Sequence, residues 1–403
     1  MKILLYNDTY KHIGGAETYC LELLAKLPNF AHEVSWLSHG TDEAHAANHY
    51  VLPHFNQGKF NYFKSKYFFN PKAYEAVKQQ LQAIKPDVVH LHHNRFYTFS
   101  VLKALKDLKI PTVQTVHDYT MLCPSQYYPD LYHESKTSEN RRDNCQLICS
   151  HGTCLPMTQR IGHRFAHDPK RRSIRKQIPT FIAPSVQLKS YLEQAEFTNV
   201  HYLPFFIEEE QWSFDANRTM KNTVLFVGRV ETNKGIYNLI NAVLDLKKDI
   251  PDIQLIIAGT GDEYKPILQK IKSENLQNTV KAVGFIDYSK IGDYYNQANV
   301  LVVPSLDMEQ FGLIGIEGLA SGIAVIGSNI GGIPEWCIHE QTGLLFEPEN
   351  TNELKNAIAR VLTNDGFSSK LTTNGMQFIK QKYNVEQHFI GLIQHFENAK
   401  PII

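Results

Sequence analysis

The sequence predicts an α/β protein made of two successive, doubly wound parallel sheets. Short apolar runs alternate with longer amphipathic segments, and this rhythm starts again near residue 222. Such alternation is typical of parallel strands joined by helices that cover the sheet. The chain has 403 residues, which is enough for two domains that each bury a core of their own. We therefore expect two Rossmann-like domains facing across a cleft.

Each apolar run in the first half is interpreted as a buried strand. The six expected strands are Lys2–Tyr6, His32–Leu37, Asp87–Leu91, Thr112–Val116, Thr180–Ala183 and Val200–Leu203. Helical spacing fills the intervals, as in residues 16–27, where Leu21, Leu24 and Ala25 share one face. Pro86 marks the end of the helix that precedes the third strand.

The second half repeats the pattern with six further strands. They are Thr223–Val227, Ile253–Ala258, Val280–Val283, Val300–Val303, Ala324–Ile326 and Leu344–Phe346. Residues 236–244 carry a continuous apolar stripe and predict a helix. We expect a first domain at 1–205 with a cysteine-rich insertion at about 121–178, a linker at 206–221, and a second domain at 222–382. A C-terminal helix at 383–403 could return to the first domain.

Composition excludes several classes of protein. Hydrophobic residues make up 43% and charged residues 20%, which excludes a disordered chain. Lys plus Arg and Asp plus Glu number 41 each, so net charge gives no argument for nucleic-acid binding. No stretch approaches the roughly 20 apolar residues that cross a bilayer, and the first residues lack the pattern of a secretion signal. We expect a cytoplasmic protein with reduced cysteines.

A loop with candidate anion-binding groups follows the first strand of each half. Gly14 and Gly15 open a helix, where backbone N–H groups can approach an anion, although a simple capped turn explains the pair equally well. The turn lacks G-x-G-x-x-G, which disfavours a nicotinamide oxidoreductase. In the second half, Arg229 and Lys234 share one strand-to-helix loop. Both can bind one diphosphate, the arginine through its planar guanidinium group and the lysine through its ammonium charge. Basic loop residues that are only solvated are the alternative.

Residues 303–317 carry the strongest pattern. Glu309 follows a buried strand, and Glu317 lies about 12 Å farther along the chain if the residues between them are helical. Two such carboxylates can accept hydrogen bonds from hydroxyl groups at the two ends of one ligand. Between them Phe311, Gly312 and Leu313 begin the helix, with N–H groups available to a phosphate.

Four motifs occur in the order and spacing of one known family: the glycine turn at 14–17, the basic loop at 226–235, the Glu309/Glu317 pair, and the glycine cluster at 331–335 with 342–345. They resemble the retaining nucleotide-sugar glycosyltransferases of family 4, which have the GT-B fold. The resemblance is dense over about residues 222–362 and sparser before them. It implies transfer of a hexose-type sugar from a UDP- or GDP-sugar to a hydroxyl of a glycan or lipid-linked glycan, in bacterial surface polysaccharide assembly.

The resemblance also implies residue roles. In the second domain, Arg229 and Lys234 would stabilise the leaving diphosphate. The sugar would be held by Glu309 with the N–H groups of Phe311 and Gly312, the phosphate by Leu313, the ribose by Glu317, and the base by the main chain at Gly284 and Phe285. In the first domain, Gly14 and Gly15 would approach the donor or acceptor. His117, which ends a strand, would lie against the sugar, and a purely structural histidine is the alternative.

The sequence gives no indication that transfer requires a metal. No two aspartates are separated by a single residue, so the D-x-D diphosphate clamp of the other large glycosyltransferase fold is absent. Two rival functions fit the same fold: a nucleotide-sugar epimerase, which needs no acceptor, and a catalytically silent sugar-nucleotide-binding subunit. The complete set of basic and acidic motif residues argues against the silent subunit.

Two local features fall outside these motifs. Cys123, Cys145, Cys149 and Cys154 crowd the insertion and suit a structural zinc site, with disulfides or unrelated buried thiols as the alternative because their spacing is unusual. Basic residues at 160–176 and aromatic residues at 60–69, interleaved with lysines, suit a peripheral contact with an anionic membrane at its inner face. A solvated helix face and core-packing aromatics are the alternatives.

Overall fold

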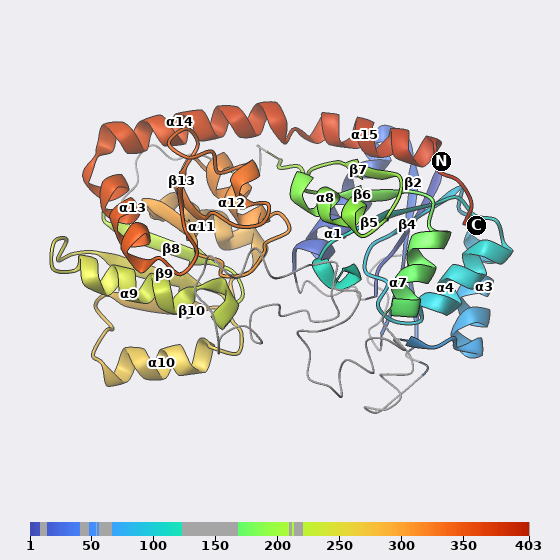
Figure 1. The fold of residues 1–403 in the computed structure, drawn as a ribbon, viewed down its shortest axis with the longest axis horizontal. Helices are drawn as coiled ribbons and strands as arrows, with labels where there is room; N and C mark the ends of the chain where they lie inside the picture. Colours follow the sequence, from blue (N-terminus) through green and yellow to red (C-terminus); the bar gives the residue numbers. More distant parts are fainter. Residues whose placement is uncertain are drawn as a thin grey trace. The chain divides into compact units, whose positions relative to one another are not determined.

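The computed structural model describes residues 1–8, 14–40, 48–53, 55, 67–122, 168–208, 212 and 221–402 (Figure 1). By their contacts the described residues form two compact units. The first comprises residues 1–122, 168–204 and 388–402, and the second comprises residues 205–387. Each unit contains one parallel sheet, which confirms the predicted α/β class.

The first unit is built on a seven-stranded sheet in the order β3-β2-β1-β4-β5-β6-β7. The strands are β1 (Lys2–Tyr6), β2 (Glu33–His39), β3 (His49–Leu52), β4 (Val88–Leu91), β5 (Thr112–Thr115), β6 (Phe181–Ala183) and β7 (Val200–Tyr202), and all pair in parallel. Six of them match the predicted strands to within two residues. β3 was not predicted, although three of its four residues form a short apolar run.

The helices of the first unit are α1 (Gly15–Lys26), α3 (Pro71–Ile84), α4 (Thr98–Asp107), α7 (Asp168–Gln177) and α8 (Val186–Gln194), with short 3-10 turns η1 (Leu27–Phe30) and η2 (Tyr119–Met121). Local sequence sets their starts. The Asn70 side chain accepts a hydrogen bond from the Ala73 N–H at 3.1 Å, and Pro71 occupies the first turn of α3.

The end of the chain completes the first unit. Helix α15 (Val385–Glu397) belongs to this unit from His388 onward. Phe389 stacks on Phe30 with ring centroids 4.9 Å apart, and Phe396 packs edge-on against His90. Beyond the helix, the Lys400 carbonyl accepts a hydrogen bond from the Thr112 N–H at the start of β5. The core of this unit therefore draws on residues more than 350 positions apart in the sequence.

The second unit is built on a six-stranded sheet in the order β10-β9-β8-β11-β12-β13. The strands are β8 (Thr223–Val227), β9 (Gln254–Ala258), β10 (Val280–Gly284), β11 (Val300–Val303), β12 (Ala324–Ser328) and β13 (Leu344–Phe346). The helices are α9 (Ile236–Leu246), α10 (Tyr264–Ser273), α11 (Ile291–Gln297), α12 (Leu313–Ala320), α13 (Thr351–Thr363) and α14 (Asp365–Lys382), with 3-10 turns η5 (Thr232–Lys234), η6 (Tyr288–Lys290) and η7 (Ile333–Glu335). All six strands were predicted.

The strand order shows where a ligand is expected to bind on each sheet. In the first sheet the chain leaves β1 toward β2 on one side and later adds β4 on the other, so the order reverses between β1 and β4. The same reversal lies between β8 and β11 in the second sheet. Ligands of open α/β sheets bind beyond the carboxyl ends of the strands at such a reversal. No helix within the described ranges has the length and apolar character to span a membrane.

Candidate active site

Close backbone packing shapes the loops that follow β8 and β11 in the second unit. Gly235 has a φ of +69°, and a Cβ on it would lie 1.9 Å from the Pro304 carbonyl oxygen. Gly331 has a φ of +63°, and its Cβ would lie 2.1 Å from the Glu309 carbonyl oxygen. Both positions therefore require glycine. The glycine cluster at 331–335 thus supports the loop that carries Glu309.

Lys234 and Glu309 come together at the reversal point of the second sheet. The Lys234 Nζ forms an ion pair with Glu309 Oε1, which also accepts a hydrogen bond from Ser305 Oγ at 2.8 Å. Burial alone would raise the pKa of Glu309, but the Lys234 ammonium outweighs it and lowers that pKa. The carboxylate is therefore ionised at neutral pH. The two side chains therefore neutralise each other.

Arg229 lies beside this pair and is half exposed. Its Nη1 donates to Glu231 Oε1 at 2.5 Å, and its charge helps to lower the pKa of Glu309. Its other guanidinium N–H groups can therefore serve an anionic ligand. The structure brings together Arg229, Lys234 and Glu309, three residues that the sequence placed in one site.

The start of α12 is held by a tryptophan that sequence reasoning did not use. The buried Trp336 Nε1 donates to the Phe311 carbonyl at 2.5 Å, and its ring lies against Gly315, where a Cβ would come within 2.1 Å. Gly312 precedes the helix with a φ of +84°. Phe311 is fully buried, so its contribution to a ligand is limited to its backbone.

Glu317 lies within α12 in a buried, aromatic environment. Its carboxylate accepts hydrogen bonds from the Tyr295 hydroxyl at 2.9 Å and the Tyr288 hydroxyl at 3.3 Å. Burial raises its pKa from 4.5 to about 7, although the two hydroxyl groups act in the opposite direction. Glu317 therefore titrates near neutral pH. The two tyrosines lie 22 and 29 residues away in sequence, and no sequence signal connected them to Glu317.

Gly284 ends the edge strand β10, and Phe285 follows it. Gly284 has a φ of +80°. Phe285 is 69% exposed and lines an open groove of about 590 Å³ together with β9 and α11 residues. An exposed aromatic ring at the carboxyl edge of a sheet is available to stack on a planar ligand.

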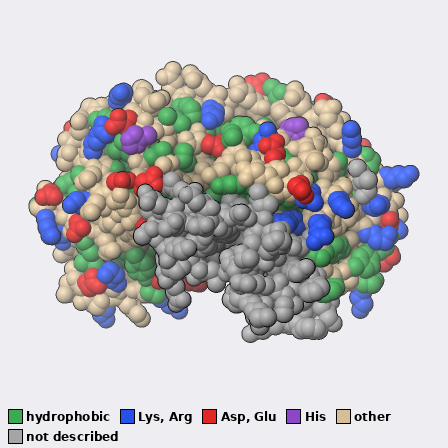
Figure 2. Space-filling view, in the orientation of Figure 1, with side chains coloured by type: hydrophobic (Ala, Val, Ile, Leu, Met, Phe, Trp, Pro, Cys, Tyr) green, Lys and Arg blue, Asp and Glu red, His purple; other side chains and the backbone are tan. Residues whose placement is uncertain are grey.

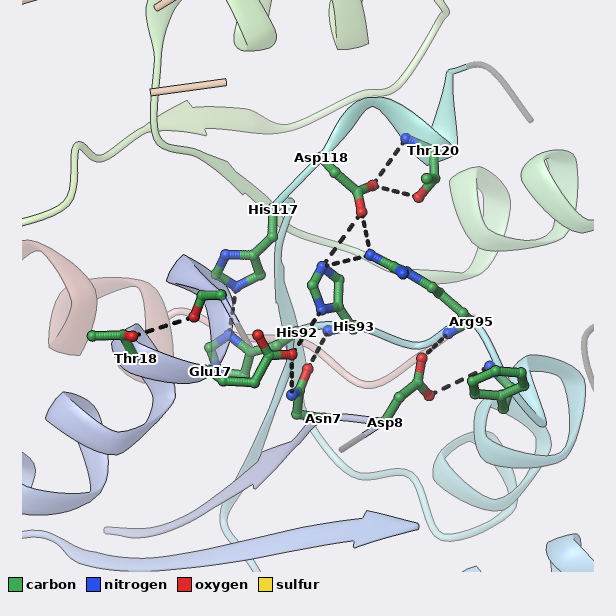
Figure 3. Close-up of polar contacts among 12 residues, drawn as sticks. Asn7, Asp8, Glu17, Thr18, His92, His93, Arg95, His117, Asp118 and Thr120 are labelled. Carbon is green, nitrogen blue, oxygen red and sulfur yellow. Dashed lines mark hydrogen bonds and ion pairs between the residues drawn. The ribbon is translucent and has the colours of Figure 1, made fainter. Parts of the chain in front are cut away.

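The corresponding edge of the first unit gathers side chains from three neighbouring strands (Figure 3). Asn7 and Asp8 follow β1, His92 and His93 follow β4, and His117 follows β5. Gly14 precedes α1 with extended backbone, and its carbonyl accepts a hydrogen bond from Thr18 Oγ1 at 3.2 Å. Gly15 is the first residue of α1. The predicted residues Gly14, Gly15 and His117 therefore all lie in the first unit, at loops that leave the carboxyl edge of its sheet.

His117 is hydrogen-bonded to a second histidine. Its Nε2 lies 2.8 Å from His92 Nδ1, and both rings pack around Tyr19. Burial, reinforced by the nearby positive charge of His93, lowers the pKa of His117 to about 3. His117 is therefore a neutral imidazole at neutral pH and can exchange hydrogen bonds without carrying charge.

His93 is the charged member of the cluster (Figure 3). Its Nδ1 lies 3.5 Å from Glu17 Oε1 and its Nε2 lies 3.4 Å from Asp118 Oδ2. Burial would lower the pKa of His93, but the two carboxylates outweigh burial and raise that pKa to about 9. Arg95 Nη2 donates to the same Asp118 oxygen at 2.6 Å. Sequence reasoning missed this group, although the run His90-Leu91-His92-His93 at a strand end was a usable signal.

Asp8 is a second buried acid in the first unit. Its carboxylate accepts the N–H groups of Arg95 at 2.7 Å and Phe96 at 3.3 Å. Burial raises its pKa to about 6 despite these bonds and the neighbouring cations. Asp8 therefore fixes the loop after β4 and was not singled out from sequence.

Basic residues of α7 occupy different environments. Figure 2 shows lysine and arginine side chains gathered over the face where α7 lies in Figure 1. Lys170 is buried, whereas Arg172 and Lys176 are exposed. Arg175 donates to the Ala195 carbonyl at 2.9 Å and pairs with Glu196. Part of this basic run is thus structural.

Several predicted residues lie outside the described ranges. They are Cys123, Cys145, Cys149 and Cys154, the basic residues Arg160 and Arg164, and the aromatic residues before Tyr67. The zinc hypothesis therefore stays a prediction, and metal analysis of protein purified without added zinc tests it. No cluster of metal-ligating side chains is found among the residues that the structure does describe.

Comparison with family models covers nearly the whole chain. A model described as Glycosyltransferase Family 4 matches residues 13–211, and a model described as Glycosyl transferases group 1 matches residues 208–378.

Three curated relatives illustrate the range of similarity. A 2-deoxystreptamine N-acetyl-D-glucosaminyltransferase of Niallia circulans is 30% identical over 163 residues, which are 40% of this chain and 42% of that protein. An uncharacterised glycosyltransferase of Methanocaldococcus jannaschii is 25% identical over 98% of both chains. A phosphatidyl-myo-inositol mannosyltransferase of Mycolicibacterium smegmatis is 25% identical over 87% of this chain and 82% of its own.

Solved structures share the fold at low sequence identity. A sucrose-phosphate synthase from Thermosynechococcus elongatus superposes with a TM-score of 0.76 at 23% identity, over 98% of both chains. HepE of Anabaena in complex with UDP-glucose gives a TM-score of 0.70 at 18% identity, over 99% of this chain and 100% of that one.

Proposed function

We propose that this chain, which belongs to glycosyltransferase family 4 and has the GT-B fold, transfers a hexose-type sugar from a UDP- or GDP-sugar to a hydroxyl group of a glycan or lipid-linked glycan. The anomeric configuration would be retained, and the product would enter surface polysaccharide assembly. One observation carries the proposal: Arg229, Lys234 and Glu309 meet at the reversal point of the second sheet. Two cations beside a carboxylate suit a diphosphate joined to a sugar.

The proposed chemistry assigns the cations to the leaving group. As the bond between the sugar and the phosphate oxygen breaks, its electron pair moves onto the diphosphate. Arg229 and Lys234 stabilise that charge. The acceptor oxygen attacks the same face of the sugar, and its proton passes to the departing phosphate oxygen. This route needs no enzymic nucleophile and no metal.

Donor binding would change the partner of Lys234. The ammonium now pairs with Glu309, so a diphosphate would take the ammonium and free the carboxylate. Glu309 could then accept hydrogen bonds from sugar hydroxyls. The backbone N–H groups of Gly312 and Leu313, at the start of α12, would serve the sugar and phosphate, and Glu317 would accept the ribose hydroxyls. Phe285 would lie beside the base.

In the first unit, His117 is suited to a hydrogen bond with the transferred sugar. Its neutral state excludes a role as a charged general acid at neutral pH. The start of α1 at Gly14 and Gly15 would approach the donor or acceptor through backbone groups.

A lipid-linked acceptor is supported by an exposed apolar groove. Phe68 and Phe69 are 54% and 44% exposed, and they line an open groove of about 550 Å³ with Lys103 and Lys106. Aromatic rings flanked by lysines suit an anionic membrane surface. Sedimentation with anionic liposomes tests this contact: binding at low salt that weakens at high salt is expected, and no binding at low salt removes the membrane from the proposal.

A panel of UDP- and GDP-sugars tests the function. One nucleotide class should raise the thermal midpoint, and its sugar should be hydrolysed slowly without an acceptor. Lys234→Ala should abolish both effects, whereas Lys248→Ala, which removes an exposed lysine after α9, should not. Conversion of the donor sugar to its epimer without acceptor would favour an epimerase instead. Binding of neither nucleotide class would refute the proposal.

A further inference from the structure

A small pocket lies beside His117 in the first unit. Its volume is about 50 Å³, and its described lining comes from the residues that follow β4 and β5, from α7 and from Tyr67. At roughly 10–15 Å³ for each water, this space holds three or four waters or one tetrahedral oxyanion. No role proposed above uses it.

The described lining is strongly cationic. His93, Arg95, Lys170 and Arg171 line the pocket, and Asp118 is the one carboxylate among the described lining residues. His93 is positively charged because Glu17 and Asp118 raise its pKa to about 9. The buried Lys170 Nζ donates to the Arg95 carbonyl at 2.6 Å, which holds its charge at this wall. Glu17, Asp118 and Asp8 offset part of this positive charge, and the remainder favours an anionic occupant.

Polar atoms in the pocket wall also need a partner. Asn94 is 94% buried, and within the described residues neither its Oδ1 nor its Nδ2 has a hydrogen-bond partner. Among the same residues, Arg95 Nε is likewise buried without a partner. A buried unpaired donor costs roughly 1–3 kcal/mol. Such groups are expected where a ligand supplies the missing bond.

We propose that this pocket binds a phosphoryl group carried by the acceptor. The inference rests on the proposed function, because only the placement of His117 against the transferred sugar makes the neighbouring space an acceptor site. The Arg95 and Arg171 guanidinium groups match the oxygens of a phosphate, and the Asn94 amide adds a neutral donor. Two guanidinium groups and an amide suit the three terminal oxygens of a phosphate monoester better than the two oxygens of a uronic acid.

Binding of inorganic phosphate, measured by isothermal titration at low ionic strength, tests the site directly. Saturable binding is expected, and it should weaken with added salt. Arg171→Gln and Asn94→Ala should each weaken it by about tenfold, the value of one charge-assisted hydrogen bond. Arg172→Gln changes the adjacent, exposed arginine of α7 and should leave binding unchanged. Absence of saturable binding, or equal binding by all variants, would overturn the inference.

Two further ligands separate this inference from the proposed function. Glucuronate should bind more weakly than phosphate, and equal binding would contradict the phosphoryl assignment. UDP should bind without displacing phosphate, because its proposed site lies in the second unit. Displacement would instead assign the phosphate to the donor site. UDP or GDP binding without phosphate binding refutes only this inference, whereas phosphate binding without either nucleotide refutes the proposed function.

Discussion

The buried carboxyl of Glu317 predicts that donor affinity depends on pH. An ionised carboxylate accepts hydrogen bonds from both ribose hydroxyls, whereas a protonated one offers fewer acceptors. Because the pKa of Glu317 is about 7 in the free protein, most molecules carry the proton at pH 6 and few do at pH 8. If only the ionised form binds, the apparent dissociation constant should fall about tenfold between these values.

Titration of UDP-glucose or GDP-mannose, whichever binds, measures this dependence, since neither sugar nucleotide has a group that titrates in this range. Glu317→Gln keeps the shape and the acceptor oxygen but removes the titration, so its profile should be flat. Tyr295→Phe removes the hydroxyl that donates to the carboxylate, so the midpoint should move to higher pH. A flat profile for the unmodified protein, or a tenfold change retained in Glu317→Gln, would refute the assignment of Glu317 to the ribose.

The same titration has a stability counterpart. The folded pKa of about 7 exceeds the ordinary value of 4.5, so the folded state binds the proton more tightly than the unfolded state. The contribution of Glu317 to stability is therefore greatest below about pH 4.5 and is lost as pH rises through 7. At about 1.4 kcal/mol for each pKa unit, the loss approaches about 3 kcal/mol. As pH rises from 5 to 8, the thermal midpoint of the unmodified protein should therefore fall relative to that of Glu317→Gln.

Three other predictions follow from the second unit. Arg229→Ala and Lys234→Ala should each remove about 3 kcal/mol of transition-state stabilisation, a loss of roughly a hundredfold or more in kcat/KM; full activity in the double variant would contradict their roles. Gly331→Ala should lower both the thermal midpoint and donor affinity, because its Cβ would displace the Glu309 carbonyl, whereas Gly292→Ala, where nothing lies within 4 Å of the added Cβ, should change neither. Transfer should persist in EDTA, and a loss restored by Mg²⁺ or Mn²⁺ would argue against cationic side chains as the charge stabilisers.

Short apolar runs predicted the strands well, because parallel strands that are buried on both faces are continuously apolar. All six strands of the second unit, from β8 to β13, were recognised in this way. The exception was β3, whose apolar run covers only Tyr50–Leu52 and whose first residue, His49, is a buried polar residue hydrogen-bonded to Ser38 of β2 at 2.9 Å. A four-residue strand that begins with a polar side chain gives only a weak hydrophobic signal.

The candidate site was predictable where one loop carries the pattern, and not where strands meet. Lys234 and Glu309 were each found on their own loops, and their pairing follows from the adjacency of β8 and β11. The group of Glu17, His93 and Asp118 comes from three separate segments that only the order β1-β4-β5 brings together. The predicted Rossmann-like fold implies that order but not which side chains of these segments make contact, so the charged state of His93 required the structure.

The return of the chain end to the first unit has a consequence for biosynthesis. Residues 388–402 supply buried side chains and the backbone partner of Thr112 in β5. Residues 205–387 of the second unit are synthesised between two parts of the first. The N-terminal part, although synthesised first, must wait unfinished until those last residues emerge. The core of the first unit can therefore be completed only after the whole of the second unit has been synthesised.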